Sequence, residues 1–289
     1  MTAFDLRPLR LGEILDRTFS LYRRNFLLFI GICGIPHLLT LAIGLVQIYL
    51  IQYPALRSGH GTAAAVMLWR VAWIAIVIGL VEVVVGIVVY LLSQGGTIFA
   101  VTEIYLGRST SISVSLRRVW DEIGSLFGVV VLNGLATLGA FLALIIPGIY
   151  VACRLLVCVP AALIEGRGPS ESLSRSWNLT RGCAGRAFVL YILYFVLTIA
   201  IGGLAGAPLQ VAIVSARHDP AMLRFYLALN QVVSVAINVL ITPVILIGTS
   251  VFYFDLRVRK EAFDLQFMMD PTSERRVQGG SSTVPSILS

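Results

Sequence analysis

Charged residues are scarce in this sequence. Only 13% of its 289 residues are Asp, Glu, Lys or Arg, whereas 57% are hydrophobic and the mean hydropathy is +0.89. Soluble domains contain about 25% charged residues, so this composition excludes a soluble domain and indicates several membrane spans. The net charge of +7 does not indicate nucleic acid as a partner, because the basic residues fall in short clusters beside apolar runs.

Residues that carry metal or nucleophilic chemistry are also few. The chain has three histidines and four cysteines, none in CxxC or HExxH spacing, and it lacks GxSxG and P-loop motifs. Carboxylates outside the apolar runs, such as Glu165, lie beside arginines, where ion pairs explain them without catalysis. We therefore expect no catalytic residue, no metal site and no cofactor. No small-residue cleavage site follows the first charges, so the first span is expected to be an uncleaved anchor.

Long apolar runs are the main feature of this sequence. Crossing about 30 Å of hydrocarbon takes about 20 residues, and six such runs occur. We place spans at residues 26–50, 70–92, 125–146, 149–164, 187–213 and 225–253. The apolar stretch from Ser125 to Leu163 is too long for one crossing, so we place a turn at Pro147-Gly148. The second span is followed by a polar break at residues 94–96, after which the chain is expected to continue as a helix toward the cytoplasm, before Arg108.

The distribution of basic residues along the chain tests this division into six spans. With these spans, 17 of the 22 Lys and Arg residues fall on one side, and three (Arg57, Arg217 and Arg224) fall on the other. Arg70 and Arg154 lie at or inside spans. Because basic residues concentrate on the cytoplasmic side, the asymmetry predicts six spans with both termini in the cytoplasm of a cell with an inner (plasma) membrane.

A threefold pattern recurs between the spans. Segments around Phe19, Trp120 and Trp177 have helical periodicity with an apolar and a basic face, which is typical of interfacial helices. Aligning these three aromatics also aligns Leu15 with Leu116 and Leu173. We interpret the pattern as three units, each an interfacial helix followed by a transmembrane hairpin; unrelated juxtamembrane helices remain the alternative.

Polar residues inside the spans are candidates for a site. A lone charge at the bilayer centre costs at least about 2.5 to 3.5 kcal/mol, so we expect Arg154 to pair with Glu82. His37, Asn133 and Asn238 are predicted at a similar depth. The five side chains could form a proton or ion route, or they could be structural hydrogen-bonding groups between helices.

Three blocks of the sequence resemble a known family. "FDLRPLRLGEILDRTFSLYRRNF", "IIPGIYVACRLLVCVPAALIEGRGPSESLSRSWNLTRG" and "FDLRVRKEAFDL" are similar to bacterial and archaeal proteins of the glycerophosphoryl diester phosphodiesterase membrane domain family and related integral membrane families. Some members of that family carry a soluble phosphodiesterase barrel, which has no counterpart here. The resemblance therefore implies a membrane module without the barrel's activity, in which Arg154 and Trp177 occupy matching positions.

Together these observations predict an all-α polytopic membrane protein with six transmembrane helices and three cytoplasmic interfacial helices. Residues 1–266 form the membrane domain, and residues 267–289 form a flexible cytoplasmic tail. The expected function is a non-enzymatic module that anchors or organises lipid or a cytoplasmic or membrane protein partner, with Phe19, Trp120 and Trp177 as interfacial anchors. The alternative is a carrier that uses the midplane polar cluster. The GxxxG spacing of Gly202 and Gly206 is compatible with a homo-oligomer but does not establish one.

Overall fold

The computed structural model describes residues 8–52 and 62–261, which fold into helices with short connections and no strand. In chain order these are α1 (Leu11–Arg24), α2 (Phe26–Gln47), the π-helical η1 (Ile48–Gln52), α4 (Thr62–Tyr105), α5 (Ile112–Asp121), α6 (Ile123–Ala143), α7 (Ile145–Leu155), α8 (Cys158–Glu165), α9 (Pro169–Leu179), α10 (Ala184–Ser215), the 3-10 turn η2 (Ala216–His218) and α11 (Pro220–Glu261). The predicted all-α class is confirmed.

Within the described residues, six helical stretches are long and apolar enough to cross a membrane. They are Phe26–Leu50, Ala72–Tyr105, Ile123–Ala143, Ile145–Glu165, Ala184–His218 and Pro220–Glu261. Each overlaps one predicted span, and the first has the predicted bounds. The predicted tail, residues 267–289, lies outside the described residues.

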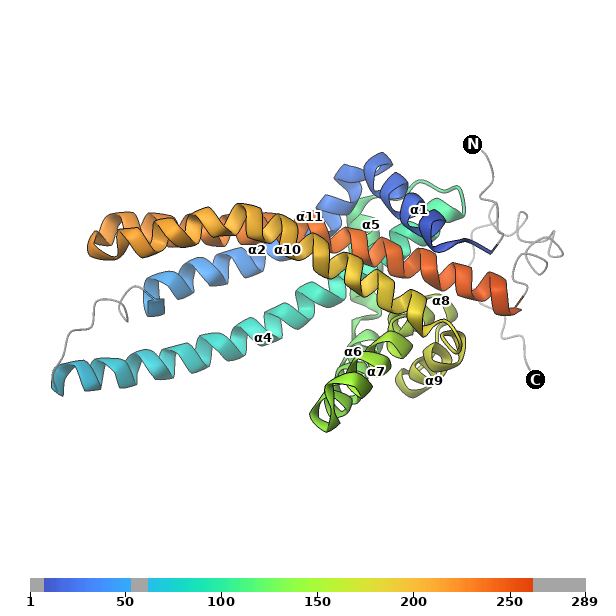
Figure 1. Ribbon diagram of the computed structural model, residues 1–289, viewed down its shortest axis with the longest axis horizontal. Helices are drawn as coiled ribbons and strands as arrows, with labels where there is room; N and C mark the ends of the chain where they lie inside the picture. The colour runs from blue at the N-terminus through green and yellow to red at the C-terminus, as the bar shows by residue number, and fades with distance from the viewer. Residues whose placement is uncertain (1–7, 53–61, 262–289) are drawn as a thin grey trace.

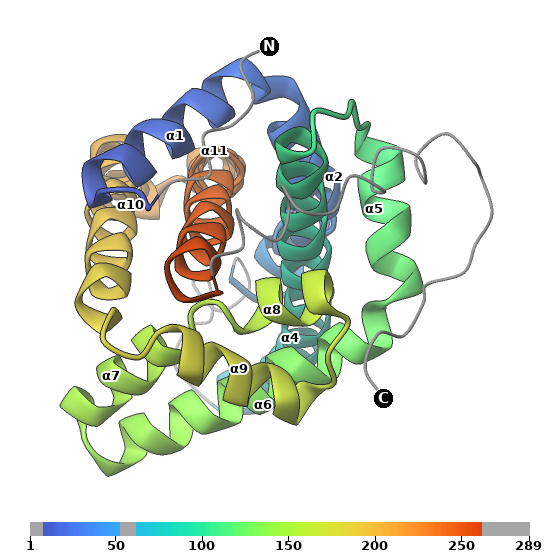
Figure 2. The same cartoon turned by 90° about the vertical axis from the view of Figure 1, so that its right-hand side faces the viewer.

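Four long helices give the molecule its length. Helices α10, α11, α2 and α4 run along the same direction in Figure 1, and α11 packs against both α10 and α2. The short helices α1, α5 and α9 lie across that direction at the end where α11 finishes, as the end-on view of Figure 2 shows. We call this the short-helix end, and the opposite end, at the α10–α11 connection, the far end. The α6–α7 hairpin also runs across the long helices in both views.

The second span continues through the polar break that the sequence predicts. Helix α4 passes through Gln94, Gly95 and Gly96 without interruption and ends at Tyr105. The two glycines permit close packing, because a Cβ on Gly95 would lie 2.8 Å from the Val119 side chain of α5, and one on Gly96 would lie 2.7 Å from Ile32 of α2. The glycines therefore mark a helix contact, and the helix continues beyond the polar residues to Tyr105, as the sequence predicts.

The turn between the third and fourth spans lies at Leu144 and not at Pro147-Gly148. Leu144 is extended (φ −166°, ψ 153°) between α6 and α7, and Pro147 lies in the first turn of α7, where its missing N–H is tolerated. Gly148 packs against Phe141, since a Cβ there would meet the ring at 2.4 Å. The fourth span then breaks after Leu155, and α8 begins at Cys158.

The buried core gathers towards the short-helix end. Ile247, Val251 and Phe252 of α11 are fully buried among side chains of α1, α2, α4, α7 and α10. Away from this core, large apolar side chains such as Leu204 of α10 are mostly exposed. Hydrocarbon solvates such side chains, so this distribution fits helices that contact lipid over much of their length.

Candidate functional site

The three short helices share one register. In all three helices the residue directly before the aligned aromatic residue is buried; these residues are Thr18, Val119 and Ser176. The residue five positions before the aromatic is also buried in each helix; these residues are Ile14, Ser115 and Ser172. Each helix is followed by two apolar limbs, α2 with α4, α6 with α7–α8, and α10 with α11. The order of elements and the shared burial therefore support the predicted threefold repeat.

Aromatic side chains occupy the exposed face of the same three helices. Phe19, Trp120 and Trp177, the predicted interfacial anchors, are 41%, 60% and 39% exposed. A second exposed aromatic residue, Phe26, Phe127 or Phe188, follows at the start of each next helix. Aromatic rings on the open face of an amphipathic helix are typical of residues that lie at a membrane surface. Whether these three anchor the protein stays a prediction.

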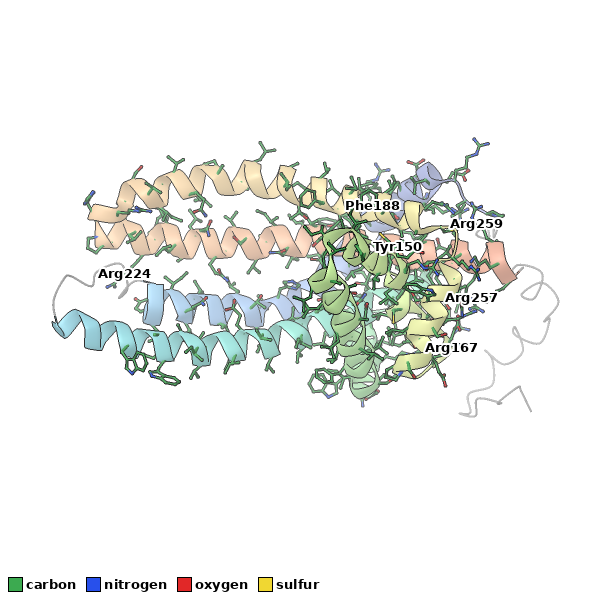
Figure 3. The ribbon with its side chains drawn as sticks, turned by 60° about the horizontal axis from the view of Figure 1, so that its bottom comes forward. Tyr150, Arg167, Phe188, Arg224, Arg257 and Arg259 are labelled. Carbon is green, nitrogen blue, oxygen red and sulfur yellow. The ribbon has the colours of Figure 1, made fainter. Side chains whose placement is uncertain are left out.

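Basic residues accompany these aromatics. Arg23 and Arg24 in the last turn of α1 and Arg117 of α5 are exposed. Figure 3 shows Arg167, Arg257 and Arg259 at the short-helix end and Arg224 at the far end. The charge asymmetry expected from the sequence is thus a separation between two ends of the molecule.

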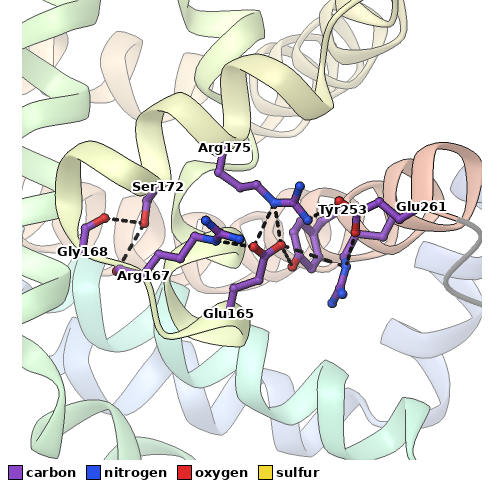
Figure 4. A network of polar contacts seen from close by, with 8 residues as sticks. Glu165, Arg167, Gly168, Ser172, Arg175, Tyr253 and Glu261 are labelled. Atoms are coloured by element: carbon purple, nitrogen blue, oxygen red, sulfur yellow. Dashed lines mark hydrogen bonds and ion pairs between the residues drawn. The ribbon is translucent and has the colours of Figure 1, made fainter. Parts of the chain in front are cut away.

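Glu165, at the end of α8, is the centre of a polar network (Figure 4). Its carboxylate accepts hydrogen bonds from Arg167 Nε (2.5 Å), Arg175 Nε (2.8 and 2.9 Å) and the Tyr253 hydroxyl (2.8 Å). These contacts join the loop before α9, α9 itself and α11. Each hydrogen-bonding group comes from a different element, so the network fixes the relative positions of these elements.

Arg175 links this network to the end of α11. It forms an ion pair with Glu261, which also contacts Arg257 Nε at 3.2 Å. Burial alone would lower the pKa of Arg175, but hydrogen bonds and the charges of Glu165 and Glu261 outweigh burial and raise it. The guanidinium therefore keeps its positive charge and serves as a permanent bridge between α9 and α11.

A second buried cluster surrounds Asp255 of α11. Its side chain is fully buried and accepts hydrogen bonds from Leu9 N (2.6 Å), Arg186 Nη1 (2.8 Å) and Arg259 Nε (3.0 and 3.1 Å). Arg186 and Arg259 also donate to the carbonyl oxygen of Leu9. Asp255 thereby ties the segment before α1 to α10 and α11. Of these partners only Arg259 lies close to Asp255 in the sequence, four residues later on the same helix.

Glu103, near the end of α4, has two arginine neighbours as well. Arg118 Nη1 lies 3.2 Å from one carboxylate oxygen, and Arg108 Nη1 lies 3.6 Å from the other. Arg118 also stacks over Phe99, with 4.7 Å between its guanidinium carbon and the ring centroid. Glu103 and Asp255 each therefore contact more arginines than one carboxylate can neutralise, which keeps the short-helix end basic.

Arg154 makes contacts quite different from those expected. Its side chain is buried (3% exposed) in the last turn of α7. Nη2 donates to the carbonyl oxygen of Trp177 (2.5 Å), and the guanidinium lies 4.5 Å from the Trp177 ring and 5.8 Å from the Tyr150 ring. In return the Arg154 carbonyl accepts hydrogen bonds from Ser176 Oγ (2.8 Å) and Thr180 Oγ1 (2.9 Å). Arg154 thus joins the C-terminal ends of α7 and α9.

The predicted Glu82–Arg154 ion pair is absent from the described residues. Glu82 is exposed on α4, whereas Arg154 packs against α9 at the short-helix end. The prediction failed because it assumed that α7 descends from the opposite membrane surface. The hairpin instead runs across the long helices (Figure 2), and Arg154 at its C-terminal end contacts Trp177 of α9.

The other members of the predicted midplane cluster also remain apart. His37 Nδ1 bonds the carbonyl of Cys33 (2.6 Å), Asn133 Oδ1 accepts from Thr137 (3.4 Å), and Asn238 Nδ2 donates to the carbonyl of Ser234 (2.9 Å). Each of these contacts lies within one helix. No contact joins the five residues to one another in the described chain, so the structure gives the carrier alternative no assembled polar route.

Residues of the types that bind metal ions lie apart in the described chain. Across residues 8–52 and 62–261, no three His, Cys, Asp or Glu side chains are placed to hold a metal ion. A small recess between α1, α10 and α11 has no charged residue in its lining, which includes Leu15, Leu190 and Val244. The short-helix end can instead bind anionic groups through exposed arginines and place aromatic rings at a membrane surface.

The fold and the sites define a polytopic helical membrane protein with a basic, aromatic end. No protein-family model, curated protein or solved structure matches the chain. The resemblance to the phosphodiesterase membrane domain family therefore stays a prediction based on three sequence blocks.

Proposed function

We propose that this protein is a non-enzymatic membrane scaffold whose short-helix end gathers anionic lipid at the cytoplasmic membrane face. The observation that carries the proposal is the shared register of α1, α5 and α9, in which Phe19, Trp120 and Trp177 are all exposed. The three helices lie at one end of the molecule and expose the same register position. This arrangement supports a single contact surface formed by all three helices. Anionic lipid is the partner whose charge complements this surface.

The charges support this choice. Each basic residue close to an anionic membrane surface contributes about 1 kcal/mol to binding, and aromatic side chains add interfacial burial. Arg23, Arg24 and Arg117 are exposed beside the aromatic residues and are available for such contacts. The basic residues at this end support the cytoplasmic part of the proposal, because basic residues of membrane proteins concentrate on the cytoplasmic side.

The buried clusters explain why the surface is suited to organising lipid or an attached partner. Asp255 and Glu165 fix the segment before α1, α9, α10 and α11 relative to one another. A lipid-binding surface on rigid elements loses less conformational entropy on binding than one on mobile loops. The short-helix end is therefore a preformed platform.

Lipid enrichment measures this directly. The protein is reconstituted in nanodiscs that contain equal amounts of phosphatidylglycerol and phosphatidylcholine, and the lipids that remain bound after release into the gas phase are counted by native mass spectrometry. We expect phosphatidylglycerol to be enriched. The triple variant R23Q/R24Q/R117Q should reduce the enrichment about tenfold or more, since about 1 kcal/mol is lost per arginine.

The matched control is Arg217→Gln, because Arg217 is an exposed arginine of η2 at the far end. It should leave the enrichment unchanged. Equal binding of the two lipids by the unmodified protein, or equal losses from the triple variant and the control, would contradict the proposal.

A further inference from the structure

Glu82 is an ionisable residue on the open surface of an apolar helix. It is exposed on α4, and its neighbours Leu80, Val81, Val83 and Val84 are exposed apolar side chains. No hydrogen bond or ion pair to Glu82 occurs in the described parts of the chain. A carboxylate in such surroundings is unusual, because ionisable residues inside membranes are almost always paired or face a water-filled cavity.

The depth of Glu82 follows from the helix on which it lies. The interfacial helix α5 packs on α4 at Gly95, where Val119 closes the contact. Glu82 is about 20 Å from Gly95 along the helix, and about 14 Å from the exposed Trp73 on its other side, at about 1.5 Å per residue. The distance between Gly95 and Trp73 along α4 is therefore about the thickness of the hydrocarbon core. Glu82 therefore lies well inside that core.

The two basic residues that the sequence predicts at a depth similar to that of Glu82 are both engaged elsewhere. Arg154 is held by Trp177 at the short-helix end, and His37 bonds the backbone of its own helix. A lipid headgroup is also excluded by depth, because it would have to move about 14 Å away from the interface. Another membrane-embedded chain is therefore the source of counter-charge that fits this depth.

The surface beside Glu82 can admit a closely packed helix. Gly79 and Gly86, three residues before and four residues after Glu82, lie on the same side of α4. No atom lies within 4 Å of a Cβ built on either glycine, apart from the neighbouring backbone of α4, in the described part of the structure. Small residues of this kind let the backbones of two membrane helices approach each other.

We propose that the face of α4 formed by Gly79, Glu82 and Gly86 binds a membrane-spanning helix of another protein that carries a basic side chain at the same depth. Charge complementarity selects this partner. A second copy of this chain in the same orientation would place one Glu82 carboxylate against another, and like charges repel. This face of α4 is distinct from the short-helix end, so the inference does not depend on the proposed function.

Site-specific photocrosslinking in native membranes tests the inference. The crosslinking residue p-benzoylphenylalanine replaces Ile78, which lies about 40° around the helix from Glu82, or Leu80, which lies about 160° away. Leu80 is the more exposed of the two, so simple accessibility would favour crosslinks from Leu80. We expect Ile78, and not Leu80, to give a discrete product, and its mass spectrum to identify a membrane span that contains Arg, Lys or His.

The same crosslinking experiment is repeated with a variant that lacks the charge of Glu82. Glu82→Gln should lower the yield of that product about tenfold or more, because the partner's cation then lacks its counter-charge. The melting temperature in detergent and the phosphatidylglycerol enrichment should not change. The inference is overturned by crosslinks to lipid only, by crosslinks to peptides of this chain, by a partner span without a basic residue, or by a yield that Glu82→Gln leaves unaltered.

Discussion

Arg154 and Trp177 hold the ends of two helices together. The guanidinium of Arg154 bonds the carbonyl of Trp177 and stacks on its ring, and hydroxyl groups one residue before and three residues after Trp177 bond the carbonyl of Arg154. A cation at the C-terminus of a helix also interacts favourably with the helix dipole. A charge inside an apolar run is thus stabilised by backbone oxygen atoms and aromatic rings, without a carboxylate.

Arg154→Gln should therefore destabilise the protein. The variant loses a charged hydrogen bond and a cation–π contact, which together are worth about 2 to 4 kcal/mol. Unfolding in detergent, followed by circular dichroism, measures the loss. Glu82→Gln is the matched control and should have no effect. Equal destabilisation by the two variants would contradict the assignment of this stabilisation to the contacts of Arg154 with α9.

Asp255→Asn should be among the most damaging single substitutions. The neutral amide leaves Arg186 and Arg259 without a counter-charge in a buried site, and breaking such a pair typically costs about 3 to 5 kcal/mol. The segment before α1 should detach, because Leu9 loses its charged acceptor. Limited proteolysis with N-terminal sequencing checks this, with the exposed Asp121→Asn as control. An N-terminal segment that is cleaved no faster than in the unmodified protein would show that Asp255 does not hold it.

Gly96→Val should loosen the packing of α4 on α2. A Cβ at Gly96 already lies 2.7 Å from the Ile32 side chain, so the helices must separate, at a cost of about 1 to 3 kcal/mol. Gly203→Val is the control, because no atom of the described structure lies within 4 Å of a Cβ there. Thermal unfolding should separate the two variants. If both melt at the same temperature, the contact at Gly96 does not limit packing.

The orientation can be tested with thiol labelling in intact cells. Arg217→Cys at the far end should react with a membrane-impermeant maleimide, and Arg117→Cys at the short-helix end should react only after the cells are opened. The four native cysteines are first replaced by alanine. The reverse pattern would place the short-helix end outside the cell and remove the basis of the cytoplasmic assignment.

Periodicity and hydropathy predicted the elements well. The buried and open faces of α1, α5 and α9 depend on residues three or four apart, and the spans depend on long apolar runs, so both are local properties of the sequence. The same periodicity placed Phe19, Trp120 and Trp177 on the apolar faces of these helices, but it did not separate the exposed Phe19 from its buried neighbour Thr18.

Long-range contacts were missed, because no local pattern encodes them. The continuity of α4 depends on side chains of α2 and α5 that fill the space at Gly95 and Gly96. The partners of Asp255 lie 246 residues away at Leu9 and 69 residues away at Arg186. The Glu82–Arg154 pair was inferred from depth alone, and the direction of the α6–α7 hairpin, which decides that depth, depends on packing against α9 and α10.

The crosswise α6–α7 hairpin makes the outline of the molecule unequal along its length. Together with α1, α5 and α9 it widens the cross-section near the short-helix end, whereas the described residues at the far end belong to the long helices and to η1 and η2 (Figure 1). With its long helices along the membrane normal, we expect such a wedge to occupy more area in one leaflet than in the other. We expect the surrounding bilayer to relieve this mismatch by bending so that the more crowded leaflet lies on the convex side.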